Sequence, residues 1–250
     1  MNLPAGWIVP DWPAPARVRA FVTTREGGMS AGEYASLNLG TKSGDDPARV
    51  AANRQAVQAH LPSFPCWLTQ VHGTAVADLD AVGDGERLRA DAAVTSLANR
   101  VAAVLTADCL PVFLCLPDAS RVAVAHAGWR GLAAGVLENA LAALGGDPSR
   151  VLAWLGPAIG PQAFEVGPEV RAAFLCAPHE EAASAFAACG AEKYKADLYA
   201  LARQRLARAG VHRVTGGGSC TYTQERQFFS YRRVKASGRM GAFIWIDEGF

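Results

Sequence analysis

Apolar positions in the middle of the chain come in short runs rich in Val, Leu and Thr, separated by Gly, Asp and Pro at intervals typical of a β-sheet. Several runs, such as Val122 to Ala125, are apolar at every position, which predicts strands covered on both faces. The strands predicted here span residues 66–72, 75–80, 91–95, 101–106, 111–117 and 121–127. Three more are predicted at residues 19–24, 151–155 and 241–247.

Helical patterns lie before, between and after these runs. The clearest helix has Asp46 as N-cap and Pro47 at its first position, and extends to about His60. Glycines at expected C-terminal positions close two more helices, over residues 132–144 and 197–209. An Ala-rich stretch over residues 168–188 is also predicted to be helical.

The chain contains no Pro/Ser-rich linker, low-complexity tract or clean repeat. Runs of strands with helices around them favour one α+β domain over residues 1–250, with mixed sheets and outer helices. Two interlocked halves remain an alternative.

Composition and charge narrow the class of partner. Half of the residues are apolar, and 24 basic against 23 acidic residues give a net charge of +1. The high apolar content excludes a disordered chain, and the small net charge predicts no electrostatic binding of nucleic acid or anionic lipid. Small-molecule partners are favoured.

Cysteine usage and the apolar segments indicate the compartment. Six cysteines show neither a C-x-x-C pair nor regular spacing, which favours a reducing environment. The Pro-rich N-terminus is not typical of a secretory leader, and Asp108 and Pro111 interrupt the most apolar stretch. We therefore expect a cytoplasmic location without a membrane span.

Candidate chemistry is concentrated at the ends of three predicted strands. His72, Cys109 and His126 each stand at a strand end, and a Gly or Pro follows soon after each. If these ends share one sheet edge, two imidazoles and a thiolate would suit Zn²⁺ with an open fourth position. Two other interpretations compete with the zinc site. Cys109 would be a core residue and the histidines structural, because the sequence separations match no compact zinc motif, or Cys109 would be a nucleophile activated by a histidine.

Other polar residues are candidates for substrate binding and proton transfer. Arg25 with Ser30, and Arg232 or Arg233, are candidate phosphate ligands, with solvated turns as the alternative. Asp108, expensive to bury alone, would pair with a base or orient a metal ligand, and Asp108 and Glu165 are both candidates for proton transfer. The last candidate, Gln70, is a predicted substrate contact.

An ordered set of segments identifies a family resemblance. TTREGGMS, YASLNLG, GDDPARVAANR, QVHG, TADCLPV, AHAGWRG, GPAIGP, FEVG and FFSYRR followed by SGRM occur in this order from residue 23 to 240. Together they resemble the laccase-domain family, long described as multicopper polyphenol oxidases and now regarded as purine nucleoside phosphorylases with adenosine deaminase activity.

The resemblance implies a layered αββα-type sandwich and a zinc ion bound by His72, Cys109 and His126. Relatives commonly carry a cysteine pair where this chain has Gln162 and Ala163, so an auxiliary thiol is absent here. The implied reaction converts adenosine, inosine or methylthioadenosine, with phosphate, into free base and ribose 1-phosphate, in a monomer or weak dimer.

Alternatives to this function remain. Some relatives are linked to peptidoglycan precursors, which suggests a cysteine-dependent hydrolase editing them. Five histidines and no H-x-H segment do not suit four-copper laccase chemistry, although Cu²⁺ replacing Zn²⁺ would permit weak oxidase activity. A metal-buffering or interaction protein is the non-enzymatic alternative.

Overall fold

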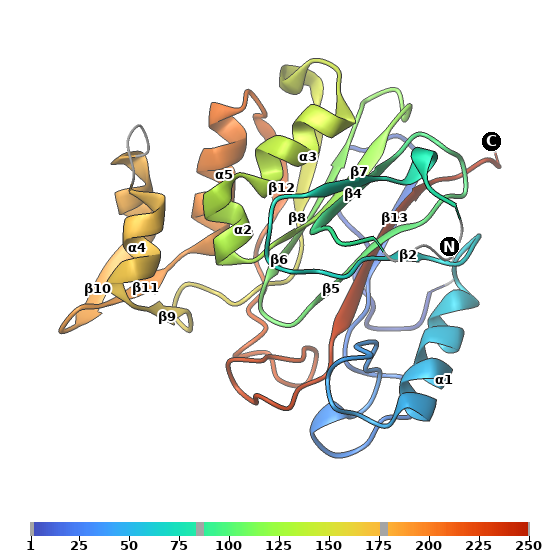
Figure 1. The fold of residues 1–250 in the computed structure, drawn as a ribbon, viewed down its shortest axis with the longest axis horizontal. Coiled ribbons are helices and arrows are strands. Elements are labelled where there is room, and N and C mark those ends of the chain that lie inside the picture. The colour runs from blue at the N-terminus through green and yellow to red at the C-terminus, as the bar shows by residue number, and fades with distance from the viewer. Residues whose placement is uncertain (1–2, 84–87, 176–179, 250) are drawn as a thin grey trace.

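Two mixed β-sheets face each other in the computed structural model, which describes residues 3–83, 88–175 and 180–249 (Figure 1). The four-stranded sheet has the order β1-β13-β5-β2, and the six-stranded sheet has the order β12-β8-β6-β7-β4-β3. Their strands are β1 (Val18–Val22), β2 (Cys66–Trp67), β3 (Val76–Asp78), β4 (Ala92–Thr95), β5 (Ala102–Thr106), β6 (Leu110–Cys115), β7 (Val122–Ala127), β8 (Leu152–Leu155), β12 (Arg213–Gly216) and β13 (Met240–Ile246).

Alternate residues of the strands enter different cores. Val22 of β1, Phe113 of β6 and Val124 of β7 pack together between the two sheets. Their neighbours Phe21 and Leu114 point to the outer faces. Because successive side chains of a strand point to opposite faces, covering both faces requires the unbroken apolar runs seen in the sequence.

Helices cover both outer faces of this sandwich. Helix α1 (Pro47–Gln58) packs on the four-stranded sheet through Val57, and the six-stranded sheet packs against α2 (Trp129–Ala134), α3 (Val136–Leu144) and α5 (Leu198–Arg208) (Figure 1). The predicted α+β sandwich with mixed sheets and outer helices is confirmed. Within the described ranges, no helix combines the length and apolar character that crossing a membrane requires.

The helix ends follow the capping signals of the sequence. Asp46 accepts a hydrogen bond from the Ala48 amide at 2.8 Å, and Asp197 caps α5 in the same way. The predicted helix over residues 132–144 is instead two helices, because Gly135 adopts a left-handed φ of 104° between them. Within the described residues the chain also forms four short 3-10 segments: η1 (Gly32–Tyr34), η2 (Leu79–Ala81), η3 (Pro148–Arg150) and η4 (Glu180–Ala185).

The Ala-rich stretch over residues 168–188 is not one helix. Helix α4 (Pro168–Phe174) ends early, residues 176–179 lie outside the described part, and η4 is followed by strand β10 (Phe186–Gly190). This strand pairs with β11 (Lys193–Ala196), which pairs with β9 (Glu165–Val166) in a small antiparallel sheet. Phe186 packs on Phe174 at a ring-centroid distance of 6.0 Å, so pairing and packing override the helical propensity of alanine.

Two predicted strands are shorter than the pattern suggests. The strand predicted over residues 66–72 ends at Trp67, since the Gln70 side chain replaces the next ladder bonds by binding the Leu105 amide and carbonyl at 2.7 and 2.9 Å. The strand predicted over residues 75–80 is β3, followed directly by η2. Here Asp78 accepts a hydrogen bond from the Asp80 amide and turns the chain.

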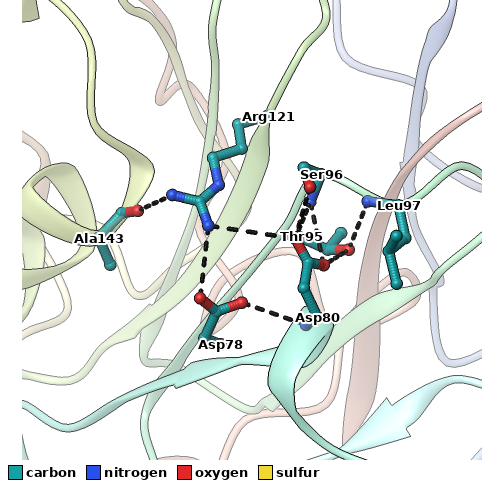
Figure 2. A network of polar contacts seen from close by, with 7 residues as sticks. All are labelled: Asp78, Asp80, Thr95, Ser96, Leu97, Arg121 and Ala143. Atoms are coloured by element: carbon teal, nitrogen blue, oxygen red, sulfur yellow. Dashed lines mark hydrogen bonds and ion pairs between the residues drawn. The ribbon is translucent and has the colours of Figure 1, made fainter.

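A polar network ties the turn at η2 to the end of β4 (Figure 2). Asp80 accepts hydrogen bonds from the Thr95 hydroxyl at 2.6 Å and from the Ser96 amide and hydroxyl. Arg121 lies 3.3 Å from the Asp78 carboxylate and donates to the Ala143 carbonyl at 2.8 Å. Because Thr95 pairs with Val122 at the start of β7, this network lies at the opposite end of that strand from His126.

Replacement of Asp80 by Ala should lower the free energy of unfolding by about 1–3 kcal/mol, because it leaves the Thr95 and Ser96 donors without an acceptor. Burial would raise the pKa of Asp80, but hydrogen bonds from Ser96 and Thr95 outweigh it and lower the pKa. This stabilisation is therefore present at neutral pH and is lost as the pH falls through the lowered pKa. Urea unfolding at several pH values measures both effects.

The matched control is Glu181→Ala, which removes a surface ion pair with Arg208 at 3.3 Å whose carboxylate is 44% exposed. Such a pair contributes about 0–1 kcal/mol. Metal content should be unchanged in both variants because neither carboxylate contacts the His72, Cys109 and His126 cluster. A loss of stability in Asp80→Ala no larger than that in the control would contradict the proposed role of the partly buried acceptor.

Candidate metal and catalytic site

His72, Cys109 and His126 converge at one edge of the six-stranded sheet. One ligand atom from each lies within 4.8 Å of the others, and Cys109 Sγ is 3.7 Å from His72 Nε2. The two imidazole rings meet edge to face with centroids 4.8 Å apart. His126 is buried, Cys109 is partly buried and His72 is exposed, so the cluster opens to solvent on one side.

Strand pairing explains why these residues meet. Cys109 immediately precedes β6 and His126 lies near the end of β7, and the antiparallel register places Pro111 opposite His126. The chain from Thr106 to Cys109 crosses from the four-stranded to the six-stranded sheet, and Asp108 turns it with a left-handed φ of 89°. The cluster therefore lies where the two sheets are joined.

The loop that carries His72 is fixed from both sides. Gln70 binds the edge of β5 through Leu105, and His72 itself adopts a left-handed φ of 60°. Non-glycine residues in this conformation cost on the order of 1–3 kcal/mol and concentrate at functional sites. Gln70, predicted as a substrate contact, is thus placed as a support of the His72 loop.

Asp91 connects the two histidines. Its Oδ1 lies 2.9 Å from His126 Nδ1 and accepts the His72 amide at 2.9 Å, while its Oδ2 accepts the Val71 and Gly73 amides at 3.0 and 2.7 Å. A carboxylate only accepts hydrogen bonds, so His126 Nδ1 carries the proton and Nε2 is left for a metal. Burial would raise the pKa of Asp91, but these hydrogen bonds outweigh it and lower the pKa to about 2.

The electrostatics favour a deprotonated thiol. Burial would raise the pKa of Cys109, but His126 and His72 outweigh it and lower the pKa to about 6. Burial lowers the pKa of His126, while Cys109 and Asp91 act more strongly and raise it to about 9. At neutral pH Cys109 is therefore a thiolate beside a protonated His126, the form that attacks electrophiles. A metal ion bound by the thiolate would also displace the proton from His126 Nε2.

The donor set fits zinc. Zinc binds imidazole nitrogen at about 2.0–2.1 Å and thiolate at about 2.3 Å, which places two such donors on a tetrahedral ion about 3.5 Å apart. The 3.7 Å between Cys109 Sγ and His72 Nε2 is close to this value. A Cβ at Gly128 would lie 2.8 Å from His72 Cδ2 and 3.0 Å from Cys109 Sγ, so only glycine leaves the required space.

Asp108 holds the C-terminal loop beside the cluster. Its Oδ1 accepts the Thr221 hydroxyl at 2.6 Å, and its Oδ2 accepts the Ser230 hydroxyl at 3.0 Å and the Arg232 amide at 2.7 Å. Its expected role of orienting a metal ligand belongs in this structure to Asp91. Asp91 stands at the start of a predicted, fully buried strand, and a charged residue there was the available signal.

Glu165 lies on β9, and its exposed side chain lies 3.6 Å from Lys195 Nζ. Its main-chain carbonyl accepts a hydrogen bond from the guanidinium of Arg232, whose amide binds Asp108, the residue before Cys109. The main chain of Glu165, and not its carboxylate, is therefore connected to the loop beside the cluster.

The candidate phosphate ligands are largely engaged within the protein. Arg25 donates to the carbonyls of Ala35 and Glu225, and Arg233 donates to the carbonyls of Thr221, Tyr222 and Phe228. Ser30 is buried, donates to Asp45 at 2.6 Å and accepts from Asn53 at 2.9 Å. Together these residues fix the loops that surround the C-terminal segment.

Known proteins resemble this chain in sequence and in fold over almost the whole of its length. A family model described as multi-copper polyphenol oxidoreductase laccase matches residues 19–247. Protein NMB0706 of Neisseria meningitidis superposes with a TM-score of 0.92 at 50% identity, covering 97% of this chain and 99% of that one. YlmD of Geobacillus stearothermophilus superposes with a TM-score of 0.86 at 30% identity, covering 99% and 98%.

Curated relatives share half of the sequence over almost the full length. Purine nucleoside phosphorylase YfiH of Escherichia coli is 53% identical over 241 residues, which cover 96% of this chain and 98% of the relative. Purine nucleoside phosphorylase PA4543 of Pseudomonas aeruginosa is 50% identical over 243 residues, covering 97% and 99%. With the family model matching most of its length, the chain belongs to the laccase-domain family, as its ordered segments indicate.

Proposed function

We propose that this chain is a zinc-dependent purine nucleoside phosphorylase, with adenosine deamination as a second activity. The observation that carries the proposal is the His72, Cys109 and His126 cluster, open on one side, in a chain about half identical to relatives that bear the phosphorylase name. Adenosine, inosine and methylthioadenosine are the proposed nucleosides. The described Cys109, Cys115 and Cys220 are free thiols, which suits a cytoplasmic enzyme.

In the proposed reaction an oxygen of phosphate forms a bond to the ribose anomeric carbon as the bond from that carbon to the purine nitrogen breaks. The electron pair of the broken bond stays on the purine, which takes up a proton. A zinc ion bound by the cluster would supply Lewis-acid polarisation. Glu165 is the proposed proton carrier, because its exposed carboxylate would take the proton that phosphate releases and pass it to the purine, while Asp108 positions the C-terminal loop.

Deamination needs water in place of phosphate as the attacking group, at the purine carbon that bears the amino group. The bond to the amino nitrogen breaks, and ammonia leaves after taking up a proton. The same exposed carboxylate of Glu165 would take the proton that the attacking water loses and pass it to the leaving ammonia. The two activities therefore differ in the group that attacks and in the bond that breaks.

The test is incubation of metal-loaded protein with inosine or adenosine, with and without phosphate. We expect free base and ribose 1-phosphate in equimolar amounts only when phosphate is present, and inosine from adenosine in either case. Chromatography of the bases with an enzymatic assay of the sugar phosphate measures both. Base release that is independent of phosphate would contradict the proposed phosphorylase.

A cysteine-dependent hydrolase is the second candidate, favoured by the lowered pKa of Cys109 between two imidazoles. It predicts a covalent intermediate on Cys109 in metal-free protein, with an amide-bearing cell-wall precursor as substrate. Phosphorolysis that requires zinc would exclude it as the main activity. A copper-dependent oxidase has less support, because among the described residues one such metal-binding cluster is present.

A further inference from the structure

Tyr231 is held beside the metal cluster by its two neighbours. The Ser230 hydroxyl and the Arg232 amide both bind Asp108 Oδ2, at 3.0 and 2.7 Å, and Asp108 directly precedes Cys109. The Tyr231 side chain is nevertheless 46% exposed. The main chain on both sides of Tyr231 is therefore anchored to the residue before Cys109, and the Tyr231 ring is accessible to solvent.

Two cationic side chains gather on this ring. Lys235 Nζ lies 4.4 Å and the guanidinium carbon of Arg239 lies 5.6 Å from the Tyr231 centroid. The Arg239 guanidinium donates from one nitrogen to the Ser237 and Gly238 carbonyls, at 2.6 and 2.9 Å, which fixes its position. The stem of Arg239 also packs closely against Gly40, where a Cβ would lie only 2.7 Å from Cγ.

Within the part of the chain that the structure describes, this pair has no direct carboxylate partner, although Asp108 and Cys109 lie near Arg239. Neither Lys235 nor Arg239 forms an ion pair with Asp or Glu among those residues, whereas Arg19, Arg121 and Arg205 do. Burial lowers the pKa of Arg239, and the nearby Cys109 and Asp108 act in the opposite direction. Two like charges close to one ring repel each other unless an anion lies between them.

The other candidate arginines lack this arrangement. Arg25 lines a surface hollow of about 380 Å³ together with Arg226, Glu26 and Glu225, so the charges around that hollow balance. Arg233 gives three hydrogen bonds to main-chain carbonyls and uses both terminal nitrogens, whereas the two such bonds of Arg239 come from one nitrogen. A dianion gains less from a hollow whose charges already balance, or from an arginine already bound to main-chain carbonyls, than from a pair of cationic side chains.

We propose that Lys235 and Arg239, gathered on Tyr231 beside Cys109, form the subsite that binds the phosphate co-substrate. This inference rests on the proposed phosphorylase function for its physiological ligand. The subsite would hold the phosphate dianion near the cluster, with Arg239 supplying directed hydrogen bonds and Lys235 a mobile charge. Phosphate bound there lies on the open side of the loop that carries Ser230 and Arg232.

The test measures phosphate and nucleoside dependence separately in Lys235→Ala and Arg239→Gln. We expect the KM for phosphate to rise about tenfold or more in each variant, because each loses a charge-assisted contact. The KM for inosine and the zinc content should stay within about twofold of the parent values. Lys235 is exposed, so its replacement keeps the fold intact even if Arg239→Gln proves unstable.

Calorimetric titration with inorganic phosphate separates this inference from the proposed function. If the parent protein binds phosphate and Lys235→Ala binds it about tenfold more weakly, the subsite stands even without phosphorolysis. If phosphorolysis proceeds with an unchanged KM for phosphate in both variants, the subsite is wrong and the function stands. Lys193→Ala, an exposed lysine on β11, is the matched control and should change neither value.

Discussion

Replacement of His126 by Ala is expected to lower bound zinc well below one equivalent and phosphorolysis by at least about 100-fold. His126 is the buried member of the cluster, and its Nδ1 proton is held by Asp91 at 2.9 Å, so its Nε2 is the most rigidly placed donor. Removing it also leaves the Asp91 carboxylate buried without its charged partner. Elemental analysis and the phosphate-dependent assay measure the two losses.

The matched control is His212→Ala, since His212 is exposed and stands before β12, outside the cluster. It should retain zinc and activity. Cys109→Ser separates the two candidate roles of the thiol. If Cys109 is a zinc ligand, the variant binds less zinc; if Cys109 is the nucleophile of a hydrolase, the variant forms no covalent intermediate. A zinc-free His126→Ala protein that still performed phosphorolysis would refute catalysis through the cluster.

The convergence of the three candidate metal ligands could be predicted because its signal is local. Each of His72, Cys109 and His126 stands beside a turn that ends or begins an apolar run, and the turns lie at one sheet edge. Asp91 gives a weaker signal, because a charged residue at the start of a buried strand indicates a partner without showing which one. That role depends on β4 pairing with β7, which places Ala92 opposite Ala125 and so brings Asp91 beside His126.

Secondary structure could be predicted where burial sets the pattern of apolar residues, but not where contacts with distant segments determine it. The central strands could be predicted because their side chains alternate between two buried faces, which makes every position apolar. Asp46 and Asp197 mark where two helices begin. The stretch from Phe186 to Gly190 becomes a strand because β11 supplies a pairing edge that the sequence pattern does not reveal. Gln70 ends β2 for a similar reason, since its side chain substitutes for main-chain pairing.

The phosphate ligands show a third limit of the sequence. Arg25 and Arg233 emerge from turn-rich segments, a pattern that serves equally for anion binding and for capping main-chain carbonyls. Only the hydrogen-bond partners distinguish these roles. Lys235 belongs to no motif, and Arg239, although part of the SGRM segment, was not among the candidate ligands; their significance comes from sharing one aromatic ring.

Replacement of Asp91 by Asn should weaken zinc binding by about 10–100-fold, the range typical of a lost carboxylate partner of a metal-bound histidine. Each Asp91 oxygen accepts from two donors, one pair being His126 Nδ1 and the His72 amide and the other the Val71 and Gly73 amides. An Asn amide nitrogen must face one of these pairs whichever way it turns, so two donors lose their acceptor. Competition with a chelator of known affinity measures the change.

Asp118→Asn is the control, because Asp118 is an exposed carboxylate that accepts only from Ser120. It should bind zinc like the parent protein. Phosphorolysis by Asp91→Asn at saturating zinc should recover in part, since the three ligands remain and only their orientation is loosened. Unchanged zinc affinity in Asp91→Asn would mean that strand pairing alone positions His72 and His126, and that the carboxylate serves the fold of the loop.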